Sequence, residues 1–470
     1  MDMIVRGGEV VIPYVGVKKV DIGIKDGKIC AIGEQLDAPG AKIIDAKGLT
    51  VFPGAIDGHS HYSYGGDEAL ARDYRITSRS SAIGGVTTVI NFMRSGRSYL
   101  EQLPHEIAIG ERESVIDFCF HLGVMTDQHL AEMRDYVEQF SSTSFKLYLG
   151  YKGLEKTRYG TDRTLDDQLL LDIFDAMKAV SPDLILCIHC ENVEMGRNFY
   201  QKYVDDPNRN QLVYFDKFNP DIVETESVIR VSYLAKQYNA KISIVHCSAG
   251  TSIEALRAMP WFDRELIHVE TCPHYLLETV DNAKGLGAVV KPPLRYKHDN
   301  DALWQAIKDD IVTFIGTDHV SLTWAEKFKK GHAIDDVTLG FGGAEFMFPQ
   351  MLSEGIKRGL SLQKIAEITS ANTAKTYGLY PAKGGIEVGS DADLILVDLE
   401  KVQTITPDTI PINSDYTIYE GREVKGWPVM TIRRGEVIAA GGKAVEPEGT
   451  GKYVRRAAQG AQLAPAVLSN

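Results

Sequence analysis

Eight short apolar runs, separated by polar and helical stretches, divide the middle of the chain after Pro53. The runs are residues 54–61, 86–93, 115–124, 144–150, 184–190, 241–248, 266–272 and 311–319. Helical patterns lie between them, for example over residues 164–180 and 226–239. Strands that alternate with helices predict parallel βα units. Eight such units predict an α/β fold, the (β/α)8 or TIM barrel, which is the feature that most restricts how this chain can fold.

Both ends of the chain instead have the residue pattern of short strands. Residues 1–53 and 384–445 predict one composite β-sandwich domain built from the two ends, with Gly-Gly and Asp-Gly pairs placed as hairpin turns. The barrel would then span residues 54–383. Residues 446–470, rich in Gly, Ala and Pro, form a C-terminal extension that we expect to be an extended arm.

Two long excursions, residues 192–224 and 320–343, follow the fifth and eighth apolar runs. We expect both to lack regular structure. Long loops after the carboxyl ends of barrel strands are where such folds build the cover of an active site. Two helices, over residues 342–359 and 361–379, should complete the barrel.

Charge and composition exclude several classes of partner. The formal net charge is −13, which argues against a nucleic-acid surface or an anionic membrane as partner. The N-terminal stretch has no continuous apolar core, so we expect neither a signal peptide nor a membrane span. Six cysteines in 470 residues are too sparse for a disulfide framework. These features predict a cytoplasmic protein.

Polar residues stand at the ends of several of the apolar runs. They are His59, His61, Lys146, His189, His246 and Asp318. In a barrel, strand ends of the same sense converge on one face, where such folds place their chemistry. His59 and His61 are two residues apart, so they point the same way from a strand. Neutral imidazoles and a carboxylate are good ligands for a divalent transition metal.

A Cys-x-x-Cys pair, Cys187 and Cys190, flanks His189 and could instead be a thiol site. Cys187 shares the parity of His189, whereas Cys190 has the opposite one. On a strand the two thiols therefore face opposite sides. We interpret His189 as the ligand, Cys187 as part of a lower barrel layer and Cys190 as packing, with the thiol site as the lesser alternative.

Each of these residues also has a structural interpretation. A lone histidine at a strand end is usually a hydrogen-bonded structural group, which is how we interpret His121. His319 is expected to support the site or pack in a loop, and His274 could either line the site or pack. A lysine ammonium has no lone pair and repels cations, so Lys146 could join a metal site only if it were neutral or converted to a carbamate. The alternative is an inward lysine that is salt-bridged to a carboxylate.

The combination of motifs resembles the cyclic amidohydrolases of the amidohydrolase superfamily, namely dihydropyrimidinases and hydantoinases. The motifs span nearly the whole chain and read, in order, "VFPGAIDGHSHYSYGG", "SFKLYLGYKG", "IHCEN", "IVHCS", "ETCPHYL", "PPLR", "GTDH", "ITSANTAKTYGLYPAKGGIEVGSDADLILVD" and "DYTIYEGREVKGWPV". The resemblance implies two divalent metal ions, usually zinc. It also implies that carbon dioxide carbamylates Lys146, which would bridge both ions. His59, His61 and Asp318 would hold one ion, and His189 and His246 the other.

The resemblance also implies the reaction. Hydroxide would attack the carbonyl of a small cyclic amide or ureide, and the ring would open without a redox or nucleotide cofactor. Tyr151, in "LGYKG", matches the tyrosine that supports the oxyanion, and Asp318 would carry the proton from the hydroxide to the leaving nitrogen. Homotetramers or homodimers are expected from the same resemblance.

Departures from the family pattern concern the substrate. Lys291 precedes "PPLR" where a serine is common, and Phe341 stands at or near the place of an asparagine. We predict that Tyr151, Lys291 and Phe341 contact the substrate, although the Lys291 side chain could point into the cleft or into solvent. "TCPHYL", with His274, is closer to allantoinases than to many hydantoinases.

Three functions remain open at this stage. The first is a dihydropyrimidine- or hydantoin-opening hydrolase. The second is an allantoinase- or dihydroorotase-like enzyme, although residues 62–71 lack the arginine that commonly binds the carboxylate in dihydroorotases. The third is a non-catalytic scaffold like the collapsin response mediator proteins, which have lost metal ligands. All six ligand positions are filled in this chain, which disfavours the scaffold.

Overall fold

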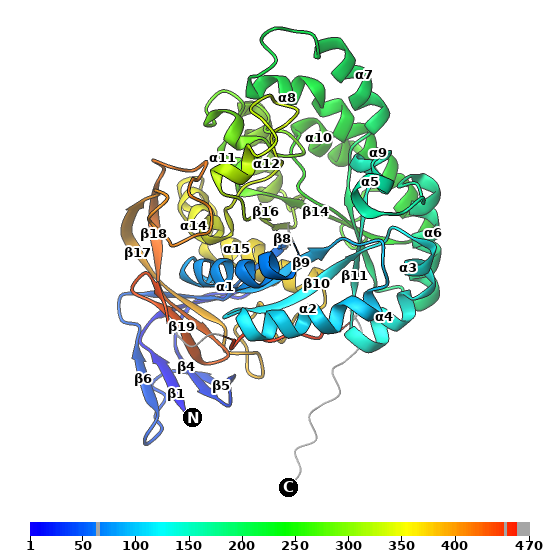
Figure 1. Cartoon of the computed structure of the whole chain (residues 1–470). Coiled ribbons are helices and arrows are strands. Elements are labelled where there is room, and N and C mark those ends of the chain that lie inside the picture. Colours follow the sequence, from blue (N-terminus) through cyan, green and yellow to red (C-terminus); the bar gives the residue numbers. More distant parts are fainter. Residues whose placement is uncertain (63–65, 446–448, 458–470) are drawn as a thin grey trace.

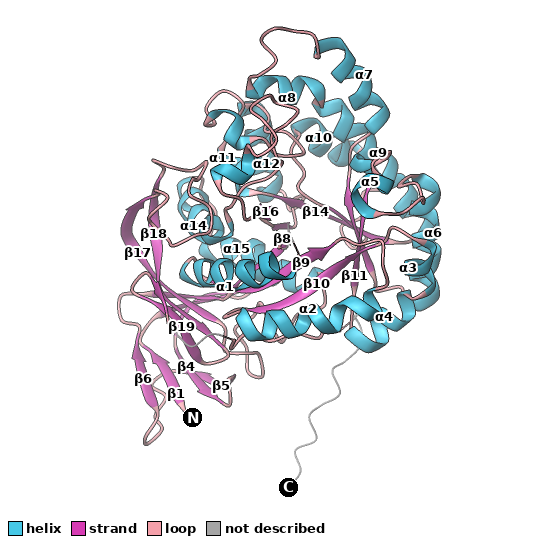
Figure 2. Ribbon diagram, viewed as in Figure 1, coloured by secondary structure: helices cyan, strands magenta, loops and turns pink. Residues whose placement is uncertain are grey.

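A ring of parallel strands surrounded by helices forms the body of the protein, and a β-rich layer lies against one side of it (Figures 1 and 2). The structure is a computed structural model that describes residues 1–62, 66–445 and 449–457. Among these residues, no helix is long and apolar enough to cross a membrane.

The strands of the ring coincide with the eight apolar runs, which confirms the predicted barrel. They are β8 (Ala55–His61), β9 (Val86–Met93), β10 (Asp117–Gly123), β11 (Ser144–Tyr148), β12 (Ile185–His189), β13 (Lys241–Ile244), β14 (Ile267–Thr271), β15 (Phe314–Ile315) and β16 (His319–Val320). Each of the first seven pairs in parallel with the next along the chain.

The eighth strand is split, which the sequence did not indicate. Its first half, β15, pairs with β14, whereas its second half, β16, pairs with β8. Residues 316–318 join the halves, so the last strand reaches from the seventh strand to the first and closes the ring. Asp318 therefore lies in a break of the strand, where its backbone is freed from regular pairing.

Helices follow the strands and cover the outside of the ring. Their bounds are α1 (Asp67–Ile83), α2 (Tyr99–Glu113), α3 (Asp127–Ala131), α4 (Met133–Phe140), η1 (Leu149–Tyr151), α5 (Glu155–Tyr159), α6 (Asp167–Val180), α7 (Val193–Tyr203), α8 (Leu212–Phe218), α9 (Asp221–Tyr238), α10 (Gly250–Ala258), α11 (Pro273–Leu277), η2 (Gly285–Ala288), α12 (Lys297–Lys308), α13 (Trp324–Lys327), η3 (Ala344–Phe346), α14 (Met347–Lys357), α15 (Leu362–Ala366), the π-helical η4 (Glu367–Ala371) and α16 (Asn372–Thr376). In α6 the Asp166 side chain caps the N-terminus, and the buried face follows helical spacing from Leu169 to Met177.

The excursion after the fifth strand was predicted to lack regular structure, and that prediction is wrong. It contains α7 and α8, which rise above the carboxyl ends of the strands in Figure 1. Within the second excursion, residues 320–343, which the structure describes in full, α13 is the only helix. Apolar residues of α8, among them Tyr214 and Phe218, pack with Ile334 in a small cluster of their own, so a local core stabilises the helices of this cover.

Strands from the two ends of the chain share one sheet, as predicted for the composite β layer. The seven-stranded sheet has the order β20-β19-β18-β17-β7-β2-β3, and the four-stranded sheet has the order β5-β4-β1-β6. The bounds are β1 (Met3–Arg6), β2 (Glu9–Ile12), β3 (Gly16–Lys19), β4 (Asp21–Lys25), β5 (Lys28–Gly33), β6 (Lys42–Asp45), β7 (Thr50–Pro53), β17 (Leu394–Thr404), β18 (Glu423–Arg433), β19 (Glu436–Ala440) and β20 (Lys443–Ala444). The predicted boundaries between the composite β domain and the barrel, at residues 53/54 and 383/384, stay a prediction.

Of the two turn signals, one behaves as expected. Asp26 and Gly27 both have positive φ, at 51° and 75°, and join the antiparallel strands β4 and β5. Gly7 and Gly8 do not form a hairpin, because β1 pairs in the four-stranded sheet and β2 in the seven-stranded one. This glycine pair lets the chain cross between sheets.

The end of the described chain lies against the barrel. Phe118, at the start of β10, donates its N–H to Lys452 and accepts from Val454. Arg456 is buried and binds the Ser144 hydroxyl at 2.6 Å. The segment 449–457 is therefore attached to the amino-terminal side of the ring, opposite the predicted site, and the rest of the predicted extension lies outside the described residues.

A buried ammonium ties the β layer to the barrel. Lys383 is 1% exposed and forms ion pairs with Asp117 of β10, with Asp391 at 2.9 Å and with Asp393 at 2.8 Å. These contacts hold the pKa of Lys383 above its ordinary value, although burial alone would lower it. One cation thus neutralises carboxylates from both layers.

We predict that Lys383→Met lowers the free energy of unfolding by about 3–5 kcal/mol, because it leaves the buried Asp393 without its cation and takes one cation from each of Asp117 and Asp391. Lys28→Met is the matched control. Lys28 also contacts Asp391, at 2.8 Å, but its side chain is 55% exposed, so its loss should cost at most about 1 kcal/mol. Urea unfolding followed by circular dichroism measures both, and equal effects would contradict the central role of Lys383.

Candidate active site

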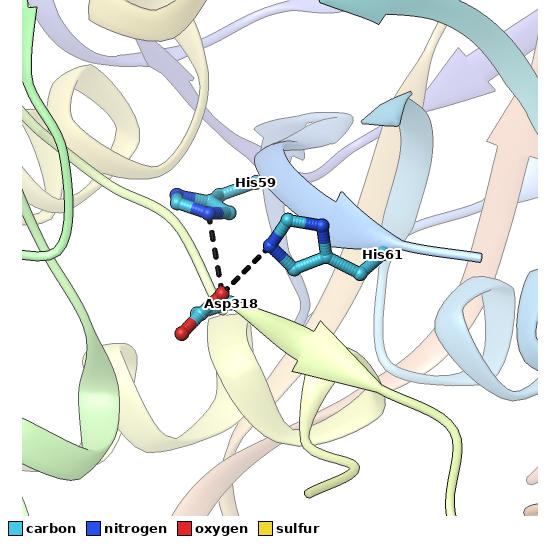
Figure 3. A group of neighbouring side chains, drawn as sticks. All are labelled: His59, His61 and Asp318. Carbon is cyan, nitrogen blue, oxygen red and sulfur yellow. Dashed lines mark ion pairs between the residues drawn. The ribbon is translucent and has the colours of Figure 1, made fainter. Parts of the chain in front are cut away.

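Three predicted ligands meet at the carboxyl ends of the first and last strands. His59 and His61 end β8, and Asp318 lies between β15 and β16. Asp318 Oδ1 is 3.2 Å from His59 Nε2 and 3.0 Å from His61 Nε2 (Figure 3). The ligand atoms of all three lie within 4.8 Å of one another. The sequence prediction that these side chains gather at one face of the barrel agrees with this geometry.

Asp57, two residues before His59, holds this group together. Its carboxylate accepts from the His59 N–H at 3.1 Å, and from both the N–H and the hydroxyl of Thr317, at 3.1 and 2.6 Å. Asp57 is fully buried, and burial raises its pKa to about 6. The first strand and the break in the last strand are thus joined through one carboxylate. Asp318, next to Thr317, adopts a left-handed φ of 52°, a conformation that costs a non-glycine residue of order 1–3 kcal/mol.

The second predicted pair lies beside the first. His189, at the end of β12, places its Nδ1 2.9 Å from His246 Nε2. The ring centroids of His59 and His246 are 5.3 Å apart, so the two groups share one site. His246 also has a left-handed φ, of 44°. Two ligand positions with this uncommon backbone indicate that the surrounding structure forces their orientation.

Two glutamates that the sequence analysis missed orient the histidines. Glu270 of β14 accepts from His59 Nδ1 at 2.6 Å and from the His246 N–H at 3.0 Å. Glu191 accepts from His189 Nε2 at 2.5 Å. A carboxylate that accepts from one ring nitrogen fixes the tautomer and leaves the other nitrogen to bind a metal. Nε2 of His59 and Nδ1 of His189 are thereby the nitrogens presented to the centre of the site.

A signal for these acidic residues was present in the sequence. Asp57 and Glu270 are charged residues inside apolar strand runs, and Glu191 follows His189 by two positions. A carboxylate in a buried strand needs a partner. Pairing these acidic residues with the nearby histidines was therefore possible in principle, although which histidine each one serves depends on the spacing between strands.

Two glycines allow the backbone to approach the histidines closely. A Cβ at Gly150 would lie 2.3 Å from His189 Nε2, and one at Gly316 would lie 2.8 Å from both His59 Cβ and Glu270 Cδ. Any larger residue at either position would displace a site histidine or its carboxylate. The "LGY" and "IGTD" stretches therefore need glycine for steric reasons.

Lys146, on β11, is 1% exposed, and its Nζ has no hydrogen-bond partner among the described residues. Nζ lies 4.7 Å from the centroid of the Phe92 ring and 5.1 Å from that of Tyr148. Burial lowers its pKa to about 8. The alternative of a salt-bridged lysine is wrong within the described chain, where no carboxylate lies within ion-pair distance of Nζ. A buried amine without a partner is costly unless something else occupies the site with it.

Burial also keeps most of the histidines neutral. It lowers the pKa of His61 to about 3 and that of His246 well below its ordinary value. Burial would lower the pKa of His59 as well, but the carboxylates of Glu270 and Asp318 raise it to about 9. The site therefore combines the neutral imidazoles of His61 and His246 with carboxylates that attract a cation, which is a donor set suited to divalent metals. In this respect the residues present fit the two metal ions that the resemblance implies.

Of the three residues predicted to contact the substrate, two line the cavity at the site and one does not. Tyr151 in η1 and Lys291 line the cavity at the cluster of predicted metal ligands, together with His189 and Asp318. Phe341 is buried, does not line that cavity, and packs edge-on against His274, with ring centroids 5.1 Å apart. Its carbonyl accepts from the Val320 N–H at 3.0 Å. Contact between Phe341 and the substrate stays a prediction.

The remaining histidines and the cysteines take structural positions. His121 is bonded through both ring nitrogens, to Ser144 at 2.5 Å and to the Gly58 carbonyl at 3.0 Å. His319 Nδ1 accepts from the N–H groups of Gly343 and Ala344. Cys187 and Cys190 belong to different apolar clusters, as strand parity predicts, and all six cysteines of the described chain are unpaired thiols.

Comparison with known proteins extends this picture. Residues 50–438 match the model of the Amidohydrolase family. The chain is 33% identical to a D-hydantoinase from Ralstonia pickettii, over a match that covers 97% of this chain and 99% of the relative. It is 30% identical to an allantoinase from Rubrobacter xylanophilus, with 97% of each chain covered. The crystal structure of a dihydropyrimidinase from Brevibacillus agri superimposes with a TM-score of 0.88, at 29% identity, over 97% of this chain and 99% of the other.

We predict that Glu270→Gln weakens zinc binding about 10- to 100-fold, because an amide orients the His59 imidazole less firmly than a carboxylate does. Glu226→Gln is the control, since Glu226 is bonded to Asn192 and Arg230 and contacts none of the ligands. Competition with a chromophoric chelator measures the affinities. Equal zinc affinity in Glu270→Gln and wild type would show that Glu270 does not orient a ligand.

Proposed function

The chain belongs to the amidohydrolase family, and we propose that it hydrolyses a small cyclic amide of the dihydropyrimidine or hydantoin type. The single observation that carries this proposal is the cluster of His59, His61 and Asp318 beside His189 and His246, at the carboxyl ends of barrel strands. Relatives that match over nearly the full chain bear the names D-hydantoinase and dihydropyrimidinase. Site and family thus point to the same class of reaction.

Two divalent ions, which we propose to be zinc, would be held by these residues. His59, His61 and Asp318 would hold one ion, and His189 and His246 the other. When bound, such ions bring the pKa of water close to neutral and polarise an amide carbonyl. Glu270 and Glu191 support the proposal because they leave His59 Nε2 and His189 Nδ1 available as ligands.

We further propose that carbon dioxide converts Lys146 to a carbamate that bridges the two ions. Its Nζ is buried at the histidine cluster and lacks a hydrogen-bond partner among the described residues. An ammonium group between two dications would be strongly repelled at low dielectric. A carbamate carries a negative charge and two oxygens, so it would remove the repulsion and could supply a ligand to each ion.

The side chains of the cavity then have distinct tasks. Hydroxide attacks the ring carbonyl, the C–N bond breaks, and the ring nitrogen takes up the proton that the hydroxide loses. Asp318 is placed to carry that proton, since its carboxylate is fixed at the centre of the site by two histidines. Tyr151 lines the same cavity and would donate its hydroxyl hydrogen to the oxyanion.

The second candidate is an allantoinase-like hydrolase. It is favoured by "TCPHYL", where His274 is buried with neither ring nitrogen hydrogen-bonded among the described residues, and by the allantoinase relative. The non-catalytic scaffold is disfavoured because the described site retains every ligand position. We also propose that the protein acts in the cytoplasm as a homodimer or homotetramer; a monomer in light scattering would contradict the assembly.

We expect zinc-loaded protein to open a hydantoin or a dihydropyrimidine in a panel that also contains allantoin, dihydroorotate and a cyclic imide. Ring opening is followed by loss of ultraviolet absorbance, and removal of zinc by a chelator should abolish it. Fastest opening of allantoin would favour the second candidate. Failure to open any ring, with two ions bound per chain, would refute the proposed function.

Lys146→Ala tests the proposed bridging role of Lys146 in the same assay. It should lose both zinc and ring opening, since no bridging ligand remains, and a short-chain carboxylate such as propionate should partly restore both. Far-ultraviolet circular dichroism checks that the barrel is intact. Full zinc content and an undiminished rate in Lys146→Ala would show that Lys146 is not the bridge.

A further inference from the structure

A buried amino group stands behind one wall of the cavity. Lys327, the last residue of α13, is 0% exposed, and its Nζ donates to the carbonyls of Val289 at 2.7 Å and of Gly340 at 2.6 Å. We propose that Lys327 is a positioning residue that holds segments 289–291 and 339–341 together and thereby sets the shape of the cavity in which the ring binds. This inference rests on the proposed function and adds to it a residue that lies outside the cavity.

The two segments form one wall of the cavity, which also contains most of the predicted metal ligands. Four residues of the segments line it, namely Val290 and Lys291 of the first and Leu339 and Gly340 of the second. Lys327 itself is not a lining residue, so it acts on a bound ring through these segments. Each segment also holds a residue that the sequence predicts to contact the substrate, Lys291 in the first and Phe341 in the second.

Lys327 reaches the two segments in different ways. Its main-chain carbonyl accepts from the Thr338 N–H at 2.9 Å, next to the second segment, whereas its side chain reaches the first. The segments also touch each other, because the Gly340 N–H donates to the Val289 carbonyl at 3.1 Å. This bond and the two bonds from Nζ make up the clamp. Without Nζ, the Gly340–Val289 bond is the only backbone hydrogen bond that joins the two segments, both of which the structure describes in full.

Carbonyls rather than a carboxylate bind this amino group. Burial lowers the pKa of Lys327 well below its ordinary value, and no charge among the described residues opposes that effect. A lysine is rarely fully buried without an ionic partner, because desolvation of its charge is costly. The clamp does not depend on that charge, since a neutral amine still has two N–H donors for the two carbonyls.

The test compares Lys327→Met with wild-type protein, both loaded with zinc. Methionine keeps an unbranched side chain of similar volume but has no side-chain N–H, so both bonds from Nζ are lost with little change in packing. Lys330→Met is the matched control, because Lys330 lies in the same loop and is exposed. kcat and KM are measured for hydantoin and for dihydrouracil, zinc content is measured per chain, and amide hydrogen exchange is followed by mass spectrometry.

Lys327→Met should raise KM about tenfold for both substrates, the loss expected when about one hydrogen bond to the ring is misplaced, with kcat and zinc content within about twofold of wild type. Exchange should become faster in peptides that cover residues 289–291 and 339–341, which include the Gly340 N–H, and stay unchanged in β11 and β12. Lys330→Met should match wild type in every readout.

An unchanged KM, or unchanged exchange in the two segments, would overturn the clamp. A loss of zinc and kcat in proportion to the change in KM would also overturn it, because it would assign Lys327 to general support of the fold. Should Lys327→Met fail to fold, Lys327→Gln takes its place. Its side chain stays polar but is shorter by one bond, so it cannot reach both carbonyls, and it should show the same selective rise in KM.

Hydrogen exchange separates the clamp from the proposed reaction. If wild-type protein opens neither ring, the proposed reaction is wrong, and the clamp is judged on exchange alone: faster exchange confined to the two segments supports it, and unchanged exchange refutes it. If both rings are opened with an unchanged KM in Lys327→Met, the reaction stands and the clamp is wrong.

Discussion

The carboxylate of Asp57 is the contact on which the site depends, because it joins the first strand of the ring to the break in the last. It binds the N–H of His59 and both polar groups of Thr317. The pairing of β16 with β8 sets the register of the first and eighth strands, with His319 opposite Ser60. Asp318 lies just before that pairing begins, and Asp57 ties the adjacent Thr317 to His59, so that His59 lies within reach of Asp318.

The parts of this structure that the sequence predicts are those that depend on local patterns. Eight apolar runs with helices between them are enough to predict a barrel, and strand parity places Cys187 and Cys190 on opposite sides of β12. The predicted metal ligands can be picked out because they stand at the ends of the apolar runs. The histidine that Glu270 orients, the split of the eighth strand and the helices of residues 192–224 could not be predicted. Each depends on spacing between elements far apart in the chain, or on a small local core that has no strong periodicity.

Lys146 and Lys291 show why residue type alone does not decide a role. Both lie at the same cavity, and both were singled out from motifs. Nζ of Lys146 has no hydrogen-bond partner among the described residues, which fits a nitrogen awaiting conversion to a ligand. Nζ of Lys291 has a carbonyl and a carboxylate nearby, which fits a lasting positive charge. The difference is in the acceptors that the fold supplies, and these come from Gly150 in η1 and from Glu191 in the loop after β12.

The site itself is unfavourable for the folded protein without cations. His246 and Asp318 adopt left-handed backbone conformations, which cost of order 1–3 kcal/mol each. Buried groups such as Lys146 Nζ add the cost of desolvation without a hydrogen bond. The apolar core shared by the barrel and the seven-stranded sheet offsets these costs. The proposed cations would offset the part of this cost that comes from buried polar groups without partners, so metal binding and folding would be coupled. The backbone strain at His246 and Asp318 is present without any ion, and it holds the two side chains in the orientation that the proposed ions require.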